Sequence, residues 1–246
     1  MADSHHLGPP PRVSGLEKVD HVELLEESGE SDDVSDLCLI GKVITQKTLN
    51  KQAVCNILQT AWRPRATLNM SPWSKNVFLF PFSDPEDRRK VLFKAPWLVM
   101  GHLLVVQPLE AGKSGSELEF QWCPFWVQAH GLSVAKLTRQ NGEIIGQRIS
   151  KLIGVEAMHD GLFHERSFLR MRVNVDISKP LSRGFFLHQN TSQSSNVKEL
   201  WISYKFEKLS DFCYDCGQIG HDNTVCKFIS RELGRRSGYG PNLRAK

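Results

Sequence analysis

Apolar residues recur at two different spacings along residues 37–107, and these spacings predict alternating strands and helices. The run LCLIGKVI, with its β-branched members, is typical of a short strand. Asn50 suits a helix N-cap, and apolar side chains follow it at helical spacing up to Trp62. Asp84 and Pro85 suit the N-cap and first position of a second helix. The predicted elements are strand 37–44, helix 51–62, strands 66–70 and 76–82 around a loop at 71–74, a helix from 85 that ends before Pro96, and strand 102–107.

This order, β-α-β-β-α-β, is the ferredoxin-like arrangement that RNA-recognition domains share with many unrelated proteins. The order predicts a fold and leaves the function open. Beyond residue 112 the pattern predicts a further α/β segment. Its elements are a strand at 125–129, a helix near 137–152 that buries Ile144, Ile145, Ile149 and Leu152, a strand at 168–177, a polar loop at 190–196 and a last strand at 200–206.

Residues 168–177 alternate between apolar and polar side chains, which predicts a half-buried strand. Leu169, Met171 and Val173 share the apolar face. Arg170 and Arg172 lie on the other face, where a strand would present them to solvent.

The charge of the chain is unevenly distributed. Residues 1–36 hold 10 of the 27 acidic residues and only 2 of the 31 basic ones, so this leader carries −8 and the remainder +12. A basic body favours a polyanionic partner. The sequence therefore predicts an α+β protein with a disordered acidic leader (1–35), a ferredoxin-like domain (36–112), a second α/β segment (113–208), a cysteine-rich unit (209–228) and a basic tail (229–246).

Several classes of protein do not fit the sequence. The start MADSHHLGPP lacks the features of a secretory signal, and the longest apolar stretch, 97–106, is too short to span a membrane. No nucleophile elbow, P-loop or dinucleotide fingerprint occurs. We therefore expect a non-enzymatic protein of the nucleus or cytoplasm, with no membrane and no small-molecule substrate as partner.

Residues 213–226 read CYDCGQIGHDNTVC, a C-x2-C-x4-H-x4-C array. Cys213, Cys216, His221 and Cys226 supply the three thiolates and one imidazole of a closed tetrahedral zinc site. Four protein ligands leave no position for a catalytic water. The sequence thus predicts a structural Zn²⁺ ion.

This array resembles the CCHC zinc knuckle of retroviral and retrotransposon nucleocapsid-type proteins, which bind single-stranded nucleic acid. Tyr214 fits the aromatic position after the first Cys, whereas Asp222 and Asn223 depart from the apolar position after the His. Residues 37–246 resemble the plant family called domain of unknown function 4283. The resemblance is carried by the knuckle and by three motifs: Ala95-Pro96-Trp97, Phe125-Trp126-Val127 and Lys179-Pro180-Leu181. Such segments are typical of LINE-type non-LTR retrotransposons, so the resemblance implies nucleic-acid binding, RNA more than DNA, and no catalytic residues.

RNA-recognition domains stack bases on exposed aromatic residues of their central strands. When Phe82 is aligned with the core Phe that closes the third strand of these domains, Phe78, Phe80 and Phe82 point inward, and Val77 and Leu79 point outward. On the first strand, Leu39 stands where these domains carry an aromatic residue. Either the second half of the chain covers this sheet face, which we favour, or the face binds something other than splayed bases.

Without stacking, affinity must come from charge. The candidate contacts are Tyr214 and the basic residues Arg88, Arg89, Lys90, Arg170, Arg172, Lys227, Arg231, Arg235 and Arg236. The expected function is zinc-dependent binding of single-stranded RNA by a nucleocapsid- or chaperone-like protein. The alternative is a protein–protein or self-association module in which the knuckle is only a structural staple.

Overall fold

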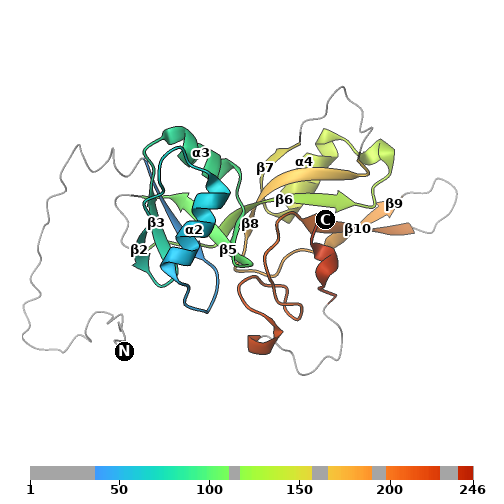
Figure 1. The fold of residues 1–246 in the computed structure, drawn as a ribbon. Coiled ribbons are helices and arrows are strands. Elements are labelled where there is room, and N and C mark those ends of the chain that lie inside the picture. The colour runs from blue at the N-terminus through green and yellow to red at the C-terminus, as the bar shows by residue number, and fades with distance from the viewer. Residues whose placement is uncertain (1–36, 111–116, 157–165, 190–197, 228–237, 246) are drawn as a thin grey trace, which may run out of the picture.

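A computed structural model describes residues 37–110, 117–156, 166–189, 198–227 and 238–245 (Figure 1). The predicted acidic leader lies outside these residues. The described chain forms an α+β fold with two five-stranded antiparallel sheets, as the sequence predicted. Among the described residues, no helix is long and apolar enough to cross a membrane.

The first unit has the predicted ferredoxin-like order with one extra strand. Its elements are β1 (Cys38–Val43), α2 (Lys51–Trp62), β2 (Ser71–Ser74), β3 (Val77–Pro81), α3 (Pro85–Phe93), β4 (Trp97–Val99) and β5 (His102–Pro108), with strand order β2-β3-β1-β5-β4. Asn50 caps α2 by accepting a hydrogen bond from the Ala53 amide, and Asp84 caps α3 by accepting one from the Glu86 amide. Both caps are confirmed.

Two details of the first unit differ from the sequence prediction. The strand expected at 66–70 is wrong, because the segment that pairs with β3 is β2, in the stretch we had assigned to a loop. Leu39 lies on the helix side of the sheet and is fully buried, so it does not occupy an outward position. Phe78, Phe80 and Phe82 point inward as predicted and are buried in the same core.

The second unit repeats the strand order of the first. Its elements are β6 (Trp122–His130), α4 (Arg139–Ile149), β7 (Lys151–Val155), β8 (Phe168–Asp176), β9 (Gly184–Gln189) and β10 (Lys198–Phe206), in the order β7-β8-β6-β10-β9. Each strand therefore corresponds to one of the first sheet. In the described chain between β8 and β9, however, no helix takes the place of α3.

The helix predicted near 137–152 is too long. It ends at Ile149, and Leu152 belongs to β7, which pairs with β8. Ile145 faces the core, whereas Ile144 is 65% exposed and was wrongly expected to be buried. Helical spacing over two adjacent isoleucines cannot decide which one faces the sheet.

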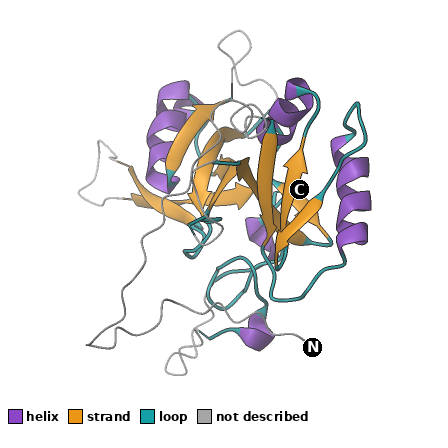
Figure 2. Ribbon diagram, turned by 90° about the vertical axis from the view of Figure 1, so that its left-hand side faces the viewer, coloured by secondary structure: helices purple, strands orange, loops and turns teal. Residues whose placement is uncertain are grey.

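The second half of the chain covers the outward face of the first sheet. Leu103 and Val105 of β5 are 0% and 1% exposed, and they belong to the same hydrophobic core as Cys123 and Phe125 of β6. Figure 2 shows the strands of both units near the middle of the molecule, with helices at its outer sides. On the central strands, the outward residues Ile40 and Val77 are 0% and 5% exposed and Leu79 is half-buried, so burial explains the absence of stacking aromatic residues on this face.

Candidate metal centre and nucleic-acid interface

The four predicted metal ligands come together in one cluster. The thiol sulfurs of Cys213, Cys216 and Cys226 and a ring nitrogen of His221 all lie within 4.8 Å of one another. The Cys216 sulfur is 3.3 Å from His221 Nε2, so Nε2 is the ring nitrogen that faces the thiols. Three thiols and one imidazole form the donor set of a closed site for a soft or borderline metal ion. The residues present thus fit a metal.

Local backbone geometry brings the cysteines together. The Gly217 amide donates to the Cys213 carbonyl (2.8 Å), and the Cys213 amide donates to the Gln218 carbonyl (2.9 Å), which closes the turn between the first two ligands. Gly217 and Gly220 have φ values of +77° and +101°, a region that L side chains rarely occupy. Burial raises the pKa of the Cys216 thiol, and the nearby Cys213 and Cys226 thiols raise it further. A metal ion must displace these protons, so its binding is weaker at low pH.

The knuckle is docked on the second unit. The Leu181 amide donates to the Gly217 carbonyl (3.0 Å), and Gln218 Nε2 donates to the Ser178 carbonyl (2.7 Å). Phe212 and Ile219 are 4% and 7% exposed and belong to the second hydrophobic core. The metal centre is therefore part of the folded body.

Part of the predicted basic tail packs back onto the knuckle. Gly238–Ala245 contains a short 3-10 helix and buries Leu243, and the Tyr239 hydroxyl donates to the Leu181 carbonyl (2.8 Å). Arg244 donates to the Tyr214 hydroxyl (2.8 Å) and pairs with Asp211 (3.0 Å). Lys227 is exposed beside the last ligand. The predicted contacts Arg231, Arg235 and Arg236 lie outside the described residues.

The basic residues of α3 are engaged with neighbouring acids. Arg89 pairs with Glu86 (2.7 Å) and Lys90 pairs with the buried Asp87 (3.1 Å), although both cations remain exposed. Arg88 is half-buried. The helix therefore presents Arg89 and Lys90 to solvent as members of ion pairs.

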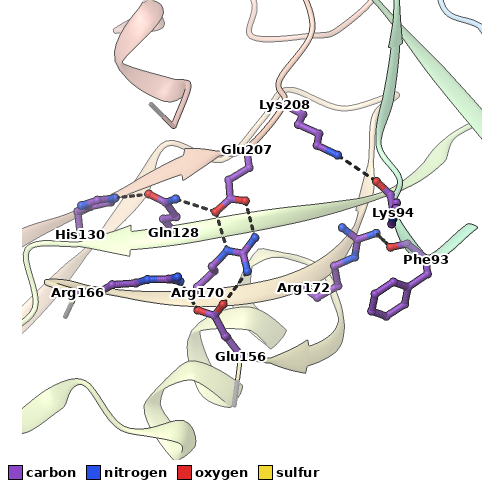
Figure 3. Close-up of polar contacts among 10 residues, drawn as sticks. All are labelled: Phe93, Lys94, Gln128, His130, Glu156, Arg166, Arg170, Arg172, Glu207 and Lys208. Carbon is purple, nitrogen blue, oxygen red and sulfur yellow. Dashed lines mark hydrogen bonds and ion pairs between the residues drawn. The ribbon is translucent and has the colours of Figure 1, made fainter. Parts of the chain in front are cut away.

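Arg170 and Arg172 lie on the face of β8 predicted from the alternation, and both are held by long-range partners (Figure 3). Arg170 donates to Glu207 through Nε and Nη2 (2.7 Å each) and to Glu156 through Nη1 (2.8 Å). Arg172 is 8% exposed and donates to the Phe93 carbonyl of the first unit. Arg172 is thus a buried contact between the two units, so the expectation that β8 would present it to solvent was wrong.

The outward face of the second sheet, opposite α4, carries aromatic and basic side chains; we call it the open face. The register places β6, β8, β9 and β10 side chains on it together. Its aromatic and basic members are Trp122, Trp126, His130, Lys151, Phe168, Arg170, Phe186, His188, Trp201 and Lys205; Arg172 is on the same side of β8 but is buried against the first unit. Sequence reasoning missed the aromatic members. Alternation over 122–130, with Trp122, Trp126 and His130 at even positions, was the signal that could have found them.

Ring contacts organise two places on the open face. His130 and Phe168 stack at 4.7 Å between centroids, and Phe168 lines a hollow of about 480 Å³ together with Arg166 and Arg170. Burial, and then the charge of Lys205, lower the pKa of His130, which favours its neutral ring. Trp201 and Phe186, 40% and 58% exposed, meet at 4.8 Å at the β9–β10 edge.

Comparison with known families gives matches to two segments of the chain. Residues 32–115 match DUF4283. The family model for this match is described as a domain of unknown function. A second family model, described as a zinc knuckle, matches residues 175–228. The resemblance inferred from the sequence is confirmed for these two segments. The zinc-knuckle match also includes β9, β10 and the link between β8 and β9 on which the knuckle is docked.

Several solved structures are similar to the chain at low scores. They include the RNA binding domain of Hrp1 in complex with RNA (11% identity, TM-score 0.25, 56% of this chain and 81% of that one), the first two RRM domains of yeast poly(U) binding protein Pub1 (9%, 0.24, 69% and 98%), and the RNA recognition domains 1 and 2 of Sex-lethal from Drosophila melanogaster (14%, 0.24, 56% and 85%). Scores of this size carry no functional argument. A comparison with curated proteins gave no match.

Proposed function

We propose that the protein binds single-stranded nucleic acid, RNA in preference to DNA, with Zn²⁺ held by Cys213, Cys216, His221 and Cys226. The observation that carries this proposal is the four-ligand cluster itself, because zinc knuckles are a recurrent module for single-stranded RNA. The ion supplies folding energy to a segment with little core of its own. Four protein ligands leave no place for a substrate, so the proposed role is binding and not catalysis.

The open face supports the same function. Aromatic rings accept bases by stacking, and cations beside them attract the phosphates. Phe168, which stacks on His130, lies next to Arg166, and Arg166 is exposed although it pairs with Glu156 (2.6 Å). The +12 charge of the chain outside its leader adds a long-range attraction for polyanions.

The test is fluorescence anisotropy of a labelled single-stranded RNA of about 12 nucleotides, titrated with zinc-loaded protein. Cys213→Ser should weaken binding by about tenfold or more, because the knuckle no longer holds its metal. Cys55→Ser, a half-buried cysteine on α2, is the matched control and should bind like the wild type. Circular dichroism of each variant separates lost binding from lost folding.

Salt dependence tests the electrostatic part of the proposal. If three phosphates are contacted, affinity should fall about 20-fold between 50 and 200 mM salt, since the slope is about −0.7 per phosphate on single strands. A DNA strand of the same sequence should bind more weakly. No binding by the zinc-loaded wild type at 50 mM salt would refute the proposed function.

A second function, protein–protein or self-association with the knuckle as a staple, is favoured by one observation. Phe212 and Ile219 are buried in the second core, so the knuckle also stabilises the body. Unchanged RNA binding by Cys213→Ser together with lost self-association in sedimentation would select this alternative. As part of the first proposal, we place the protein in the nucleus or cytoplasm, as a nucleocapsid- or chaperone-like product of a plant LINE-type retrotransposon.

A further inference from the structure

A groove of about 790 Å³ lies between the knuckle and the first unit. One wall consists of Thr45 and Lys47, in the loop after β1, with His102 at the start of β5. The other wall includes Tyr214 and Asn223 of the knuckle, and Arg244 of the C-terminal segment also lines the groove. Its volume lies in the range of small-molecule sites, about 300–1,000 Å³.

The two walls are held in place by direct contacts. The Asp211 amide donates to the Gly101 carbonyl in the turn between β4 and β5 (3.2 Å). Gly220 lies so close to Ile44 that a Cβ added at this glycine would be 2.8 Å from Ile44 Cγ2. The knuckle therefore meets the first unit at close range, and the groove is bounded by both.

The knuckle wall offers an oriented aromatic ring. Tyr214 is half-exposed, packs edge-on against Phe212 at 5.0 Å between centroids, and accepts a hydrogen bond from Arg244 at its hydroxyl. The Asn223 Oδ1 accepts from the Tyr214 amide (3.0 Å), which leaves the Asn223 amide nitrogen as a donor on the groove wall. A ring fixed in this way loses little rotamer entropy when a ligand packs on it.

The first unit contributes a second ring and hydrogen-bonding groups. His102 is half-buried, and its Nε2 lies 3.5 Å from the Thr45 hydroxyl. Lys47 is exposed at the rim, and Asp222 of the knuckle lines the same groove. The groove therefore combines aromatic rings with hydrogen-bonding groups and with side chains of both charges. Such a lining suits a flat heterocycle with a polar edge better than an apolar side chain or a bare phosphate.

We infer that this groove binds a nucleobase of a single-stranded nucleic acid, with Tyr214 stacking on the base and His102, Thr45 and Lys47 of the first unit completing the site. The inference rests on the proposed function for the class of ligand. It adds that the first unit and the knuckle form one composite site, so that neither wall alone gives full affinity for the nucleic acid.

The first test uses the full, zinc-loaded chain and the labelled RNA described above. His102→Ala should weaken binding about fivefold or more, in line with the loss of one ring from a base site. Lys47→Ala should also weaken binding, whereas Lys51→Ala, an exposed lysine at the start of α2 and outside the groove, should not. Wild-type affinity in both groove variants would overturn the composite site.

The second test needs no variant. RNA that contains 4-thiouridine is crosslinked to the wild-type protein by ultraviolet light, and the adducts are mapped by mass spectrometry. We expect adducts on Tyr214 and also within residues 45–47 or at His102. RNA binding with adducts on the knuckle alone would refute the composite site and leave the proposed function standing. A wild-type protein that binds no RNA would refute the proposed function itself.

Discussion

Among single residues, Arg170 is held by two carboxylates and an indole ring. Its guanidinium lies 3.9 Å from the centroid of Trp126 and shares hydrogen bonds with Glu207 and Glu156. The side chains of Arg170 and Glu207 are only 20% and 23% exposed, so this pair is poorly screened by solvent.

Glu207→Gln should lower the free energy of unfolding by about 1–3 kcal/mol at pH 7, measured in urea. Glu199→Gln, at a half-exposed position on β10, is the matched control and should change it by less than about 0.5 kcal/mol.

The effect of Glu207→Gln should depend on pH. Hydrogen bonds from Arg170 lower the pKa of Glu207 in the folded protein, whereas its pKa in the unfolded chain is about 4.3. A carboxyl with a lowered folded pKa contributes stability that is complete above the unfolded pKa and is lost as the pH falls through the folded one. The difference between wild type and Glu207→Gln should therefore shrink below about pH 4. A constant difference down to pH 3 would contradict this assignment.

At the scale of single residues, the sequence predicted the features that depend on residues close together in the chain. The metal ligands were identified because all four lie within one short stretch, where spacing dictates geometry. The outward placement of Arg170 and Arg172 followed from strand alternation. Their partners did not, because Glu207 and the Phe93 carbonyl approach only when distant strands and both units are packed.

Among the elements, the C-terminal segment stands out because it packs into the core of the second unit, whose described residues include no counterpart of α3. Leu181, in the link between β8 and β9, and Leu243, in the C-terminal 3-10 helix, are 1% and 3% exposed in the same core. The Ala245 amide donates to the Phe206 carbonyl at the end of β10 (2.9 Å). Segments from beyond the sheet thus supply apolar cover that a helix gives the first unit.

Leu243→Ala should therefore destabilise the protein like a core substitution. We expect a loss of about 2–5 kcal/mol in the free energy of unfolding, measured by urea denaturation with tryptophan fluorescence. Asn242→Ala, an exposed neighbour in the same short helix, should leave the stability unchanged. Equal stability of the two variants would show that the segment only rests on the surface.

The elements that the sequence failed to predict are short strands. β4 and β9 form hairpins with β5 and β10, and β7 follows α4 after a single residue. Three to six residues carry too little periodicity to separate a strand from a loop or from the end of a helix. Their positions are determined by pairing: Leu152 is a strand residue because it is opposite Val173.

For the whole molecule, one hydrophobic core connects the metal centre with both units. Phe212 and Ile219 of the knuckle, Phe125 of β6 and Leu103 of β5 belong to the same buried cluster. Loss of the metal should therefore loosen more than the knuckle, because the apolar side chains next to the ligands would lose their support. Structural zinc contributes about 10–16 kcal/mol to the folding of isolated fingers, enough to matter for a marginally stable body.

Hydrogen exchange with and without a zinc chelator measures this coupling. Chelation should speed exchange at the Leu181 amide, which donates to the Gly217 carbonyl, and at the Asp211 amide, which donates to Gly101. It should leave the Val54 amide in α2 protected, because α2 packs in the other core, and returning zinc should reverse the change. Faster exchange confined to Cys213 and Gly217 would mean that the knuckle opens without the body. The groove between knuckle and first unit would then depend on zinc only through Tyr214, and His102 would keep its position without the metal.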